Sequence, residues 1–117
     1  MRTISTAIFC SLFSIVGFAQ KKQEIKLWPG QPPGQEATQV KSIIQKDTGR
    51  HILKITEVTE PSLLVFRTEN GNGAAVIISP GGGNKFLSWD LEGTEIAHWL
   101  NGLGYTAFIL QYRIPNQ

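Results

Sequence analysis

The sequence has little cysteine and no run of like charge. Its single cysteine, Cys10, lies in an apolar N-terminal stretch, so the rest of the chain cannot form an internal disulfide. This excludes the class of small secreted domains that disulfides hold together. The chain has 11 Lys and Arg against 9 Asp and Glu, a net charge of +2 with no basic cluster. That balance gives no support for binding to nucleic acid or to an anionic membrane.

The first 20 residues have the pattern of an export signal. Arg2 gives a positive start, residues 7 to 18 are mainly apolar, and small residues occupy the positions before the expected cleavage site at Ala19. Polar residues on both sides leave this stretch shorter than the roughly 20 consecutive apolar residues of a membrane-spanning helix. We therefore expect residues 1–19 to be a signal peptide, the protein to be periplasmic or extracellular, and no stable membrane anchor to remain. Cleavage would leave 98 of the 117 residues, with 10 basic and 9 acidic side chains.

Two regions are expected after the signal peptide. Residues 20–50 are predicted to be an N-terminal arm and loop, because three of the six prolines fall between residues 26 and 34 and the rest is mostly polar. Residues 51–117 are predicted to form a partial α/β domain. Residues 52–58 and 63–66 are rich in β-branched and apolar side chains, which predicts a pair of strands. Two Asn-Gly pairs in residues 69–73 then predict a tight hairpin turn.

A short apolar run, residues 74–78, ends in Ser79, Pro80 and three consecutive glycines. The absence of polar alternation is typical of a strand buried on both faces of a parallel sheet. Glycines reach positive φ without a steric cost, so the loop can turn its N–H groups outward and receive negative charge.

Residues 90–104 carry the one clear helical pattern. Asp90 is a plausible N-cap, Gly104 a plausible left-handed stop, and the strand 105–110 follows at once. Four apolar residues are expected to form the buried stripe of this helix: Ile96, Trp99, Leu100 and Leu103. Strand, helix and strand make one βαβ crossover with parallel strands, which places the glycines at a carboxyl strand end, where open α/β sheets bind ligands. If the sheet stops at the strand 105–110, that strand has an open edge.

Three interpretations of the glycine loop remain. A phosphate-binding P-loop or a dinucleotide fingerprint is disfavoured, because Asn84 and Phe86 stand where those motifs need glycine and a small or hydroxyl residue. The loop could simply turn the chain into a helix. It could also be an oxyanion hole, in which backbone N–H groups stabilise the anion formed when a serine attacks an ester carbonyl.

Several segments together resemble the N-terminal part of a known family. These are Pro80-Gly81-Gly82-Gly83, Glu92-Gly93, the helix ending in residues 97–105, and Tyr112-Arg113-Ile114-Pro115. From about Trp28 to Pro115 the chain resembles secreted bacterial α/β-hydrolases of the esterase/lipase group, closest to the acetylxylan-esterase-like branch, some of whose members are labelled xylanase B. The resemblance implies an N-terminal portion of an α/β-hydrolase fold, with a strand pair, one βαβ crossover and an incomplete sheet.

The resemblance also implies a Ser-Asp/Glu-His triad, acetyl or feruloyl esters on plant polysaccharide or a small ester as substrate, and no metal or organic cofactor. By position, Gly82 and Gly83 match the oxyanion donors of the family, Gly81 shapes the loop, and Asn84 lies where the acyl pocket is formed. Trp89, near the loop, is a second candidate for substrate binding. The pair Tyr112-Arg113 matches a scaffold element of the family.

The nucleophile motif G-x-S-x-G occurs nowhere in these 117 residues. His98 precedes any possible nucleophile, against the Ser…Asp/Glu…His order of the fold. We therefore expect the chain to supply half of an esterase site and to be inactive alone, and we regard it as a fragment that is prone to associate. The alternative is a small exported carbohydrate-binding or interaction domain with Trp28, Trp89 and Trp99 as stacking candidates.

Overall fold

The computed structural model describes residues 23–34, 43–47, 49 and 52–115. The expected export signal and its cleavage site lie outside these residues. The described part is a mixed α/β structure with two sheets and one α-helix. None of its helices is long and apolar enough to cross a membrane.

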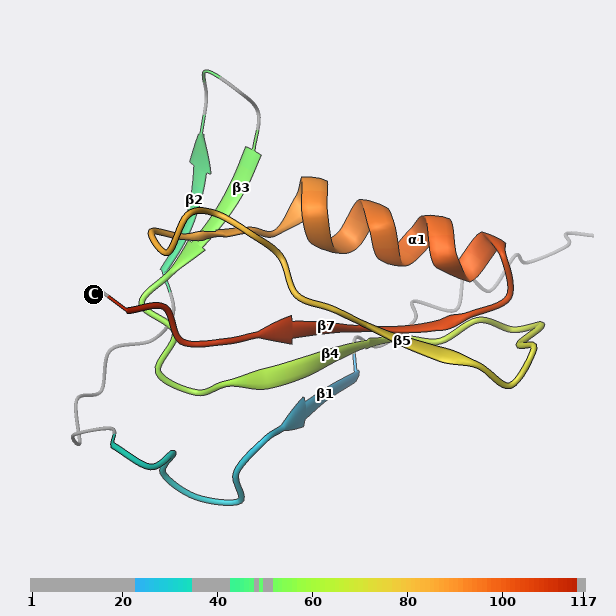
Figure 1. The fold of residues 1–117 in the computed structure, drawn as a ribbon, viewed down its shortest axis with the longest axis horizontal. Coiled ribbons are helices and arrows are strands. Elements are labelled where there is room, and N and C mark those ends of the chain that lie inside the picture. The colour runs from blue at the N-terminus through green and yellow to red at the C-terminus, as the bar shows by residue number, and fades with distance from the viewer. Residues whose placement is uncertain (1–22, 35–42, 48, 50–51, 116–117) are drawn as a thin grey trace, which may run out of the picture.

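The larger sheet has four strands in the order β1-β4-β7-β5 (Figure 1). Its strands are β1 (Gln23–Lys26), β4 (Ser62–Phe66), β5 (Ala75–Ile78) and β7 (Thr106–Gln111). The strands β5 and β7 run parallel, while β1 and β7 each pair antiparallel with β4. The predicted parallel crossover is thus confirmed.

One face of this sheet is covered by helical structure (Figure 1). A π-helical segment, η1 (Asp90–Thr94), leads directly into α1 (Glu95–Gly102). Alternate residues of the two parallel strands face it, because side chains in a strand point to opposite sides in turn. Among them Ile78, Ala107 and Ile109 are buried and form the centre of the core.

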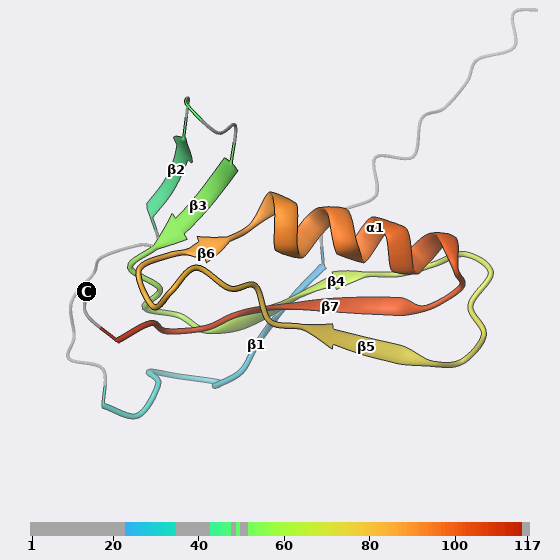
Figure 2. The ribbon, with the colours of Figure 1, turned by 45° about the horizontal axis from the view of Figure 1, so that its top comes forward.

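The second sheet has three antiparallel strands in the order β2-β3-β6. They are β2 (Ile43–Asp47), β3 (Ile52–Thr56) and β6 (Leu87–Ser88). In Figure 2, β6 lies between the glycine loop and the start of the helical segment. The pairing of Ile55 with Leu87, both buried, joins this sheet to the core.

The predicted strand pair is wrong in its pairing, although both strands form. The strand β3 pairs with β2 and β6, and β4 pairs with β1 and β7, so the two belong to different sheets. The predicted hairpin between β4 and β5 is also wrong. These two strands do not pair with each other, because β7 lies between them. A turn is nevertheless present before β5, with Gly73 at φ +86°. Pairing depends on distant segments of the chain, which a local pattern of side chains does not contain.

Three further predictions need correction. Residues 43–47, expected as loop, form β2, and residues 23–26 of the expected arm form the edge strand β1. The strand β7 is central in its sheet, and the edges of that sheet are β1 and β5 instead. The α/β class therefore holds, with a second sheet that the sequence pattern did not indicate.

The buried stripe predicted for the helix is also wrong in three of its four positions. Ile96, Trp99 and Leu103 are exposed, Trp99 by 63%, while Gly93 and Ala97 are buried. The small residues face the sheet because they let the helix backbone approach it closely. The predicted stop is confirmed: Gly104 has φ +87°, and the amides of Gly104 and Tyr105 bond back to the carbonyls of Asn101 and Leu100.

A candidate oxyanion loop at the end of β5

The glycine loop, residues 79–86, leaves the carboxyl end of β5 and leads into β6. Three consecutive residues in it have positive φ: Gly82 at +153°, Gly83 at +62° and Asn84 at +59°. Glycine takes such values freely, and asparagine is one of the few other residues that tolerate the left-handed region. The sequence therefore permits a backbone path that residues with bulkier side chains would resist.

Three successive carbonyl groups of this loop are held by hydrogen bonds. The Tyr112 hydroxyl donates to Pro80 O at 2.6 Å. The amide of Ser88 donates to Gly81 O at 2.8 Å, and that of Lys85 donates to Gly82 O at 3.2 Å. The peptide planes 80–81, 81–82 and 82–83 are therefore each anchored at the oxygen.

Anchoring the oxygens also orients the amides. The peptide bonds of the described residues are all trans, so each N–H points away from the C=O of its own plane. The N–H of Gly81 donates to Glu92 Oε2 at 2.9 Å. Within the described residues, the N–H groups of Gly82 and Gly83 have no acceptor. The amide of Asn84 also has no acceptor among these residues, so the loop offers a run of adjacent donors that includes Gly82 and Gly83.

Two backbone N–H groups can do specific chemistry when they converge on one oxygen. They stabilise the negative charge that develops as a nucleophile adds to an ester carbonyl. Removing one such donor typically raises the activation free energy by about 2.7–4 kcal/mol. The role of Gly82 and Gly83 as donors to a substrate stays a prediction.

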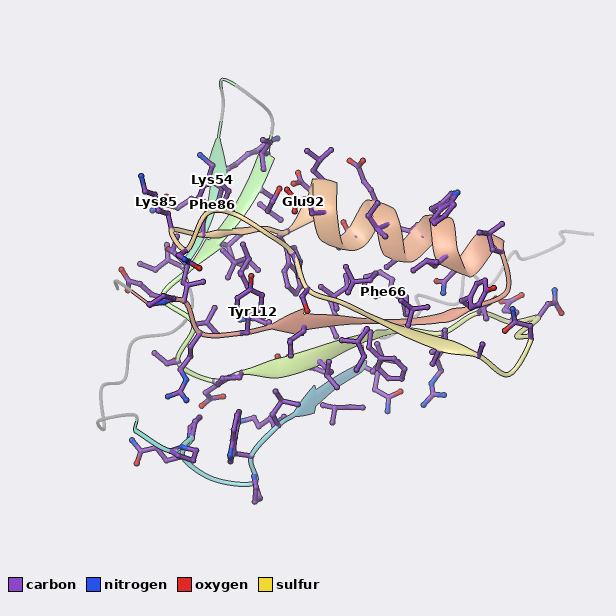
Figure 3. All side chains as sticks on the ribbon, in the orientation of Figure 1. Lys54, Phe66, Lys85, Phe86, Glu92 and Tyr112 are labelled. Carbon is purple, nitrogen blue, oxygen red and sulfur yellow. The ribbon has the colours of Figure 1, made fainter. Side chains whose placement is uncertain are left out.

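Phe86 packs closely against Gly82 in the loop, a contact that the sequence reasoning missed. A Cβ placed on Gly82 would lie 1.9 Å from Phe86 O and 3.0 Å from its Cδ2. The Lys54 ammonium lies over the Phe86 ring, 4.7 Å from its centroid. Figure 3 shows Lys54, Lys85 and Phe86 gathered at this end of the molecule. Nothing in the spacing of these residues signals the cluster, because the pairing of β3 with β6 brings Lys54 to Phe86 across a long separation in the sequence.

The other two predicted site residues are placed differently. Asn84 is exposed in the loop beside Gly83, so it lies where a substrate could reach it. Trp89 is only 7% exposed and belongs to the core. Its indole therefore lacks the open face that stacking on a sugar would need, and its role in substrate binding stays a prediction that burial disfavours.

Asp90 was expected to cap the helix but binds a neighbouring strand. Its Oδ2 accepts the amide of Leu53 in β3 at 2.8 Å, and its Oδ1 accepts the amide of Leu91 at 2.8 Å. The residue in the N-cap position of η1 is Trp89, without a side-chain capping bond. Asp90 thus joins the helical segment to the second sheet, close to the loop. No three metal-ligating side chains gather anywhere in the described part of the chain.

Comparison with known proteins gives a partial match. The acetylxylan esterase of Xylanibacter ruminicola is 34% identical to this chain over 64 residues, which are 55% of this chain and 13% of the relative. The chain therefore matches only a small part of that protein's length. No family model and no solved structure matches the chain. The partial match hints at an esterase-like function.

Proposed function

We propose that this chain is the N-terminal part of a secreted serine esterase that hydrolyses acetyl or related acyl esters on plant polysaccharide. In this proposal it belongs to an α/β-hydrolase fold and contributes the oxyanion loop. The nucleophile, the acid and the histidine of the triad lie outside these 117 residues. The reaction needs no metal or organic cofactor.

The observation that carries the proposal is that the Gly82 and Gly83 amides have no hydrogen-bond acceptor among the described residues. Both lie at the carboxyl end of a parallel strand, where ligands bind in open α/β sheets. Internal bonds hold the carbonyl side of each peptide plane and leave the N–H groups without an internal acceptor among the described residues. Donors that are fixed before the substrate arrives need no reorganisation during the reaction, which is what makes an oxyanion hole effective.

The substrate class and the location rest on weaker support. The partially matching relative is named acetylxylan esterase, which favours acetyl groups on a plant polysaccharide. The N-terminal sequence pattern favours export, which would bring the protein to such an extracellular polymer.

The coding DNA beyond codon 117 provides the sharpest test. We expect a G-x-S-x-G motif there, in frame or in an adjacent frame. The product that includes it should release acetate from acetylated xylan, and its Ser→Ala variant and the 117-residue chain should not. The absence of such a motif in every frame, or turnover by the 117-residue chain itself, would contradict the proposal.

A non-catalytic carbohydrate-binding domain is the second candidate, and the exposure of Trp99 favours it. Exposed indoles stack on sugar rings. Retention of the 117-residue chain on insoluble xylan, lost in Trp99→Ala, would support this candidate over the esterase.

A further inference from the structure

The peptide unit between Pro80 and Gly81 is held at both of its polar atoms. Its carbonyl oxygen accepts the bond from the Tyr112 hydroxyl, and its N–H donates to the carboxylate of Glu92. Figure 3 shows Glu92 on the helical side of the loop and Tyr112 on the side of the sheet. Because a trans peptide is planar with its C=O and N–H in opposite directions, the two bonds fix the orientation of the whole plane.

Close packing brings Glu92 to this position. A Cβ on its neighbour Gly93 would lie 3.4 Å from Pro80 Cγ and 3.4 Å from Ile109 Cγ2, so the π-helical segment rests directly on the loop and on β7. A Cβ on Gly81 would lie 2.8 Å from Glu92 Oε2, so a larger residue 81 would make the carboxylate shift away from its present position. The bond from Gly81 to an ionised carboxylate is also of the stronger, charge-assisted type.

The fixed plane directly precedes the two candidate donors. Its orientation sets the direction in which the chain enters Gly82, and therefore where the amides of Gly82 and Gly83 point. Glu92 also occupies the Gly81 amide, so the amides of Gly82 and Gly83 are the first in the loop that an incoming oxygen can meet. We propose that Glu92 and Tyr112 are positioning residues, which clamp the peptide unit 80–81 and so aim the amides of Gly82 and Gly83. This inference rests on the proposed function and assigns the side chains that hold its loop in shape.

The geometry predicts which substitutions preserve the clamp. Glu92→Ala removes the acceptor, whereas Glu92→Gln retains an oxygen at the same reach. Glu92 is exposed, and the bond to Gly81 is its only polar contact within the described residues, so neither change should threaten the fold. Glu95 is an exposed acidic residue of the same helical region, and Glu95→Ala is therefore the matched control.

The test uses the ¹⁵N-labelled full chain and its amide spectra. Glu92→Ala should shift the resonances of Gly81, Gly82 and Gly83 and speed exchange of the Gly81 amide proton by about tenfold, in line with the loss of a bond to a charged group. Tyr112→Phe should shift the same three resonances. Glu92→Gln should restore most of the wild-type positions, and Glu95→Ala should leave all three in place.

The melting temperature separates positioning from general stabilisation. Positioning requires the three glycine resonances to move in Glu92→Ala while the melting temperature stays close to that of Glu95→Ala. Unchanged glycine resonances in Glu92→Ala, or a Glu92→Gln spectrum identical to that of Glu92→Ala, would overturn the inference.

Acetate titration tests the proposed function separately. Acetate should shift the Gly82 and Gly83 amides of the wild type and shift them less in Glu92→Ala. If acetate shifts neither amide in the wild type, the anion-binding role fails, while the acetate-free spectra still decide whether Glu92 and Tyr112 set the loop geometry.

Discussion

The side-chain amide of Asn101 donates hydrogen bonds to the backbone carbonyl groups of Phe66 and Tyr105. Its Nδ2 donates to Phe66 O at 3.0 Å and to Tyr105 O at 2.8 Å, and the site is partly buried. Phe66 is the last residue of β4, and Tyr105 immediately precedes β7. Asn101 thus ties the end of α1 to both strands beneath it.

Removing this donor should destabilise the protein. Asn101→Ala leaves two partly buried carbonyl oxygens without their donor, and we expect a loss of about 1–3 kcal/mol in the free energy of unfolding. Asn101→Asp keeps the shape but replaces the donor with an acceptor, so its loss should be at least as large. Urea denaturation followed by tryptophan fluorescence measures both. An Asn101→Asp variant as stable as the wild type would show that the two bonds contribute nothing.

The helix shows which features of a fold local patterns can predict. Its existence, its stop at Gly104 and the parallel strands on either side follow from periodicity, glycine and chain order. Its orientation does not follow, because its large apolar side chains do not mark the buried face. Gly93 and Ala97 face the sheet instead. The polar Asn101 is half-buried because its side chain donates hydrogen bonds to backbone carbonyl groups.

Asp90 should stabilise the junction between the helical segment and the second sheet. Its carboxylate accepts the amide of Leu53, and the amide of Trp89 returns a bond to Leu53 O at 2.8 Å. A hydrogen bond to a charged group contributes roughly 1.5–3 kcal/mol, so Asp90→Ala should lower the free energy of unfolding by about that amount. Asp90→Asn keeps an acceptor and should lose less. Hydrogen exchange at the Leu53 amide checks the cause: it should accelerate in Asp90→Ala and remain slow in a Glu95→Ala control.

The candidate site was predictable only in part, for a similar reason. Three glycines after a buried strand are visible in the sequence, and they led to Gly82 and Gly83. The side chains that shape the loop come from elsewhere: Tyr112 follows the next parallel strand, and Lys54 comes from a second sheet. Their contacts depend on tertiary packing, which spacing along the chain does not encode.

Alanine at Gly82 and at Gly83 should have unequal effects. At Gly82 a Cβ would lie 1.9 Å from Phe86 O at φ +153°, so the backbone itself must move. At Gly83 a Cβ meets open space, and the only cost is the left-handed φ of +62°, about 1–2 kcal/mol. We expect Gly82→Ala to lose more stability than Gly83→Ala and to displace the Ser88 amide resonance, since Ser88 bonds to Gly81. Equal losses in urea denaturation would contradict the tight contact between Gly82 and Phe86.

The outer edge of β5, which pairs with no other strand in the described part of the chain, should cause self-association. Its four residues are Ala75, Val76, Ile77 and Ile78, without charge or proline, and Ile77 is 63% exposed. Edge strands of this kind pair with other chains, and lysine is a common natural protection against it. Ile77→Lys should therefore weaken association by roughly tenfold or more, since losing one buried Ile contact is worth about 1.5–3 kcal/mol.

The edge strand β2 supplies the matched control. Ile44 is 64% exposed there, but Lys46 already lies in the same strand, so Ile44→Lys should change association little. Sedimentation velocity across a range of protein concentrations measures both variants. If Ile44→Lys abolishes association and Ile77→Lys does not, the reactive edge belongs to the second sheet. A wild type that stays monomeric at every concentration would mean that β5 is protected by something other than the composition of its strand.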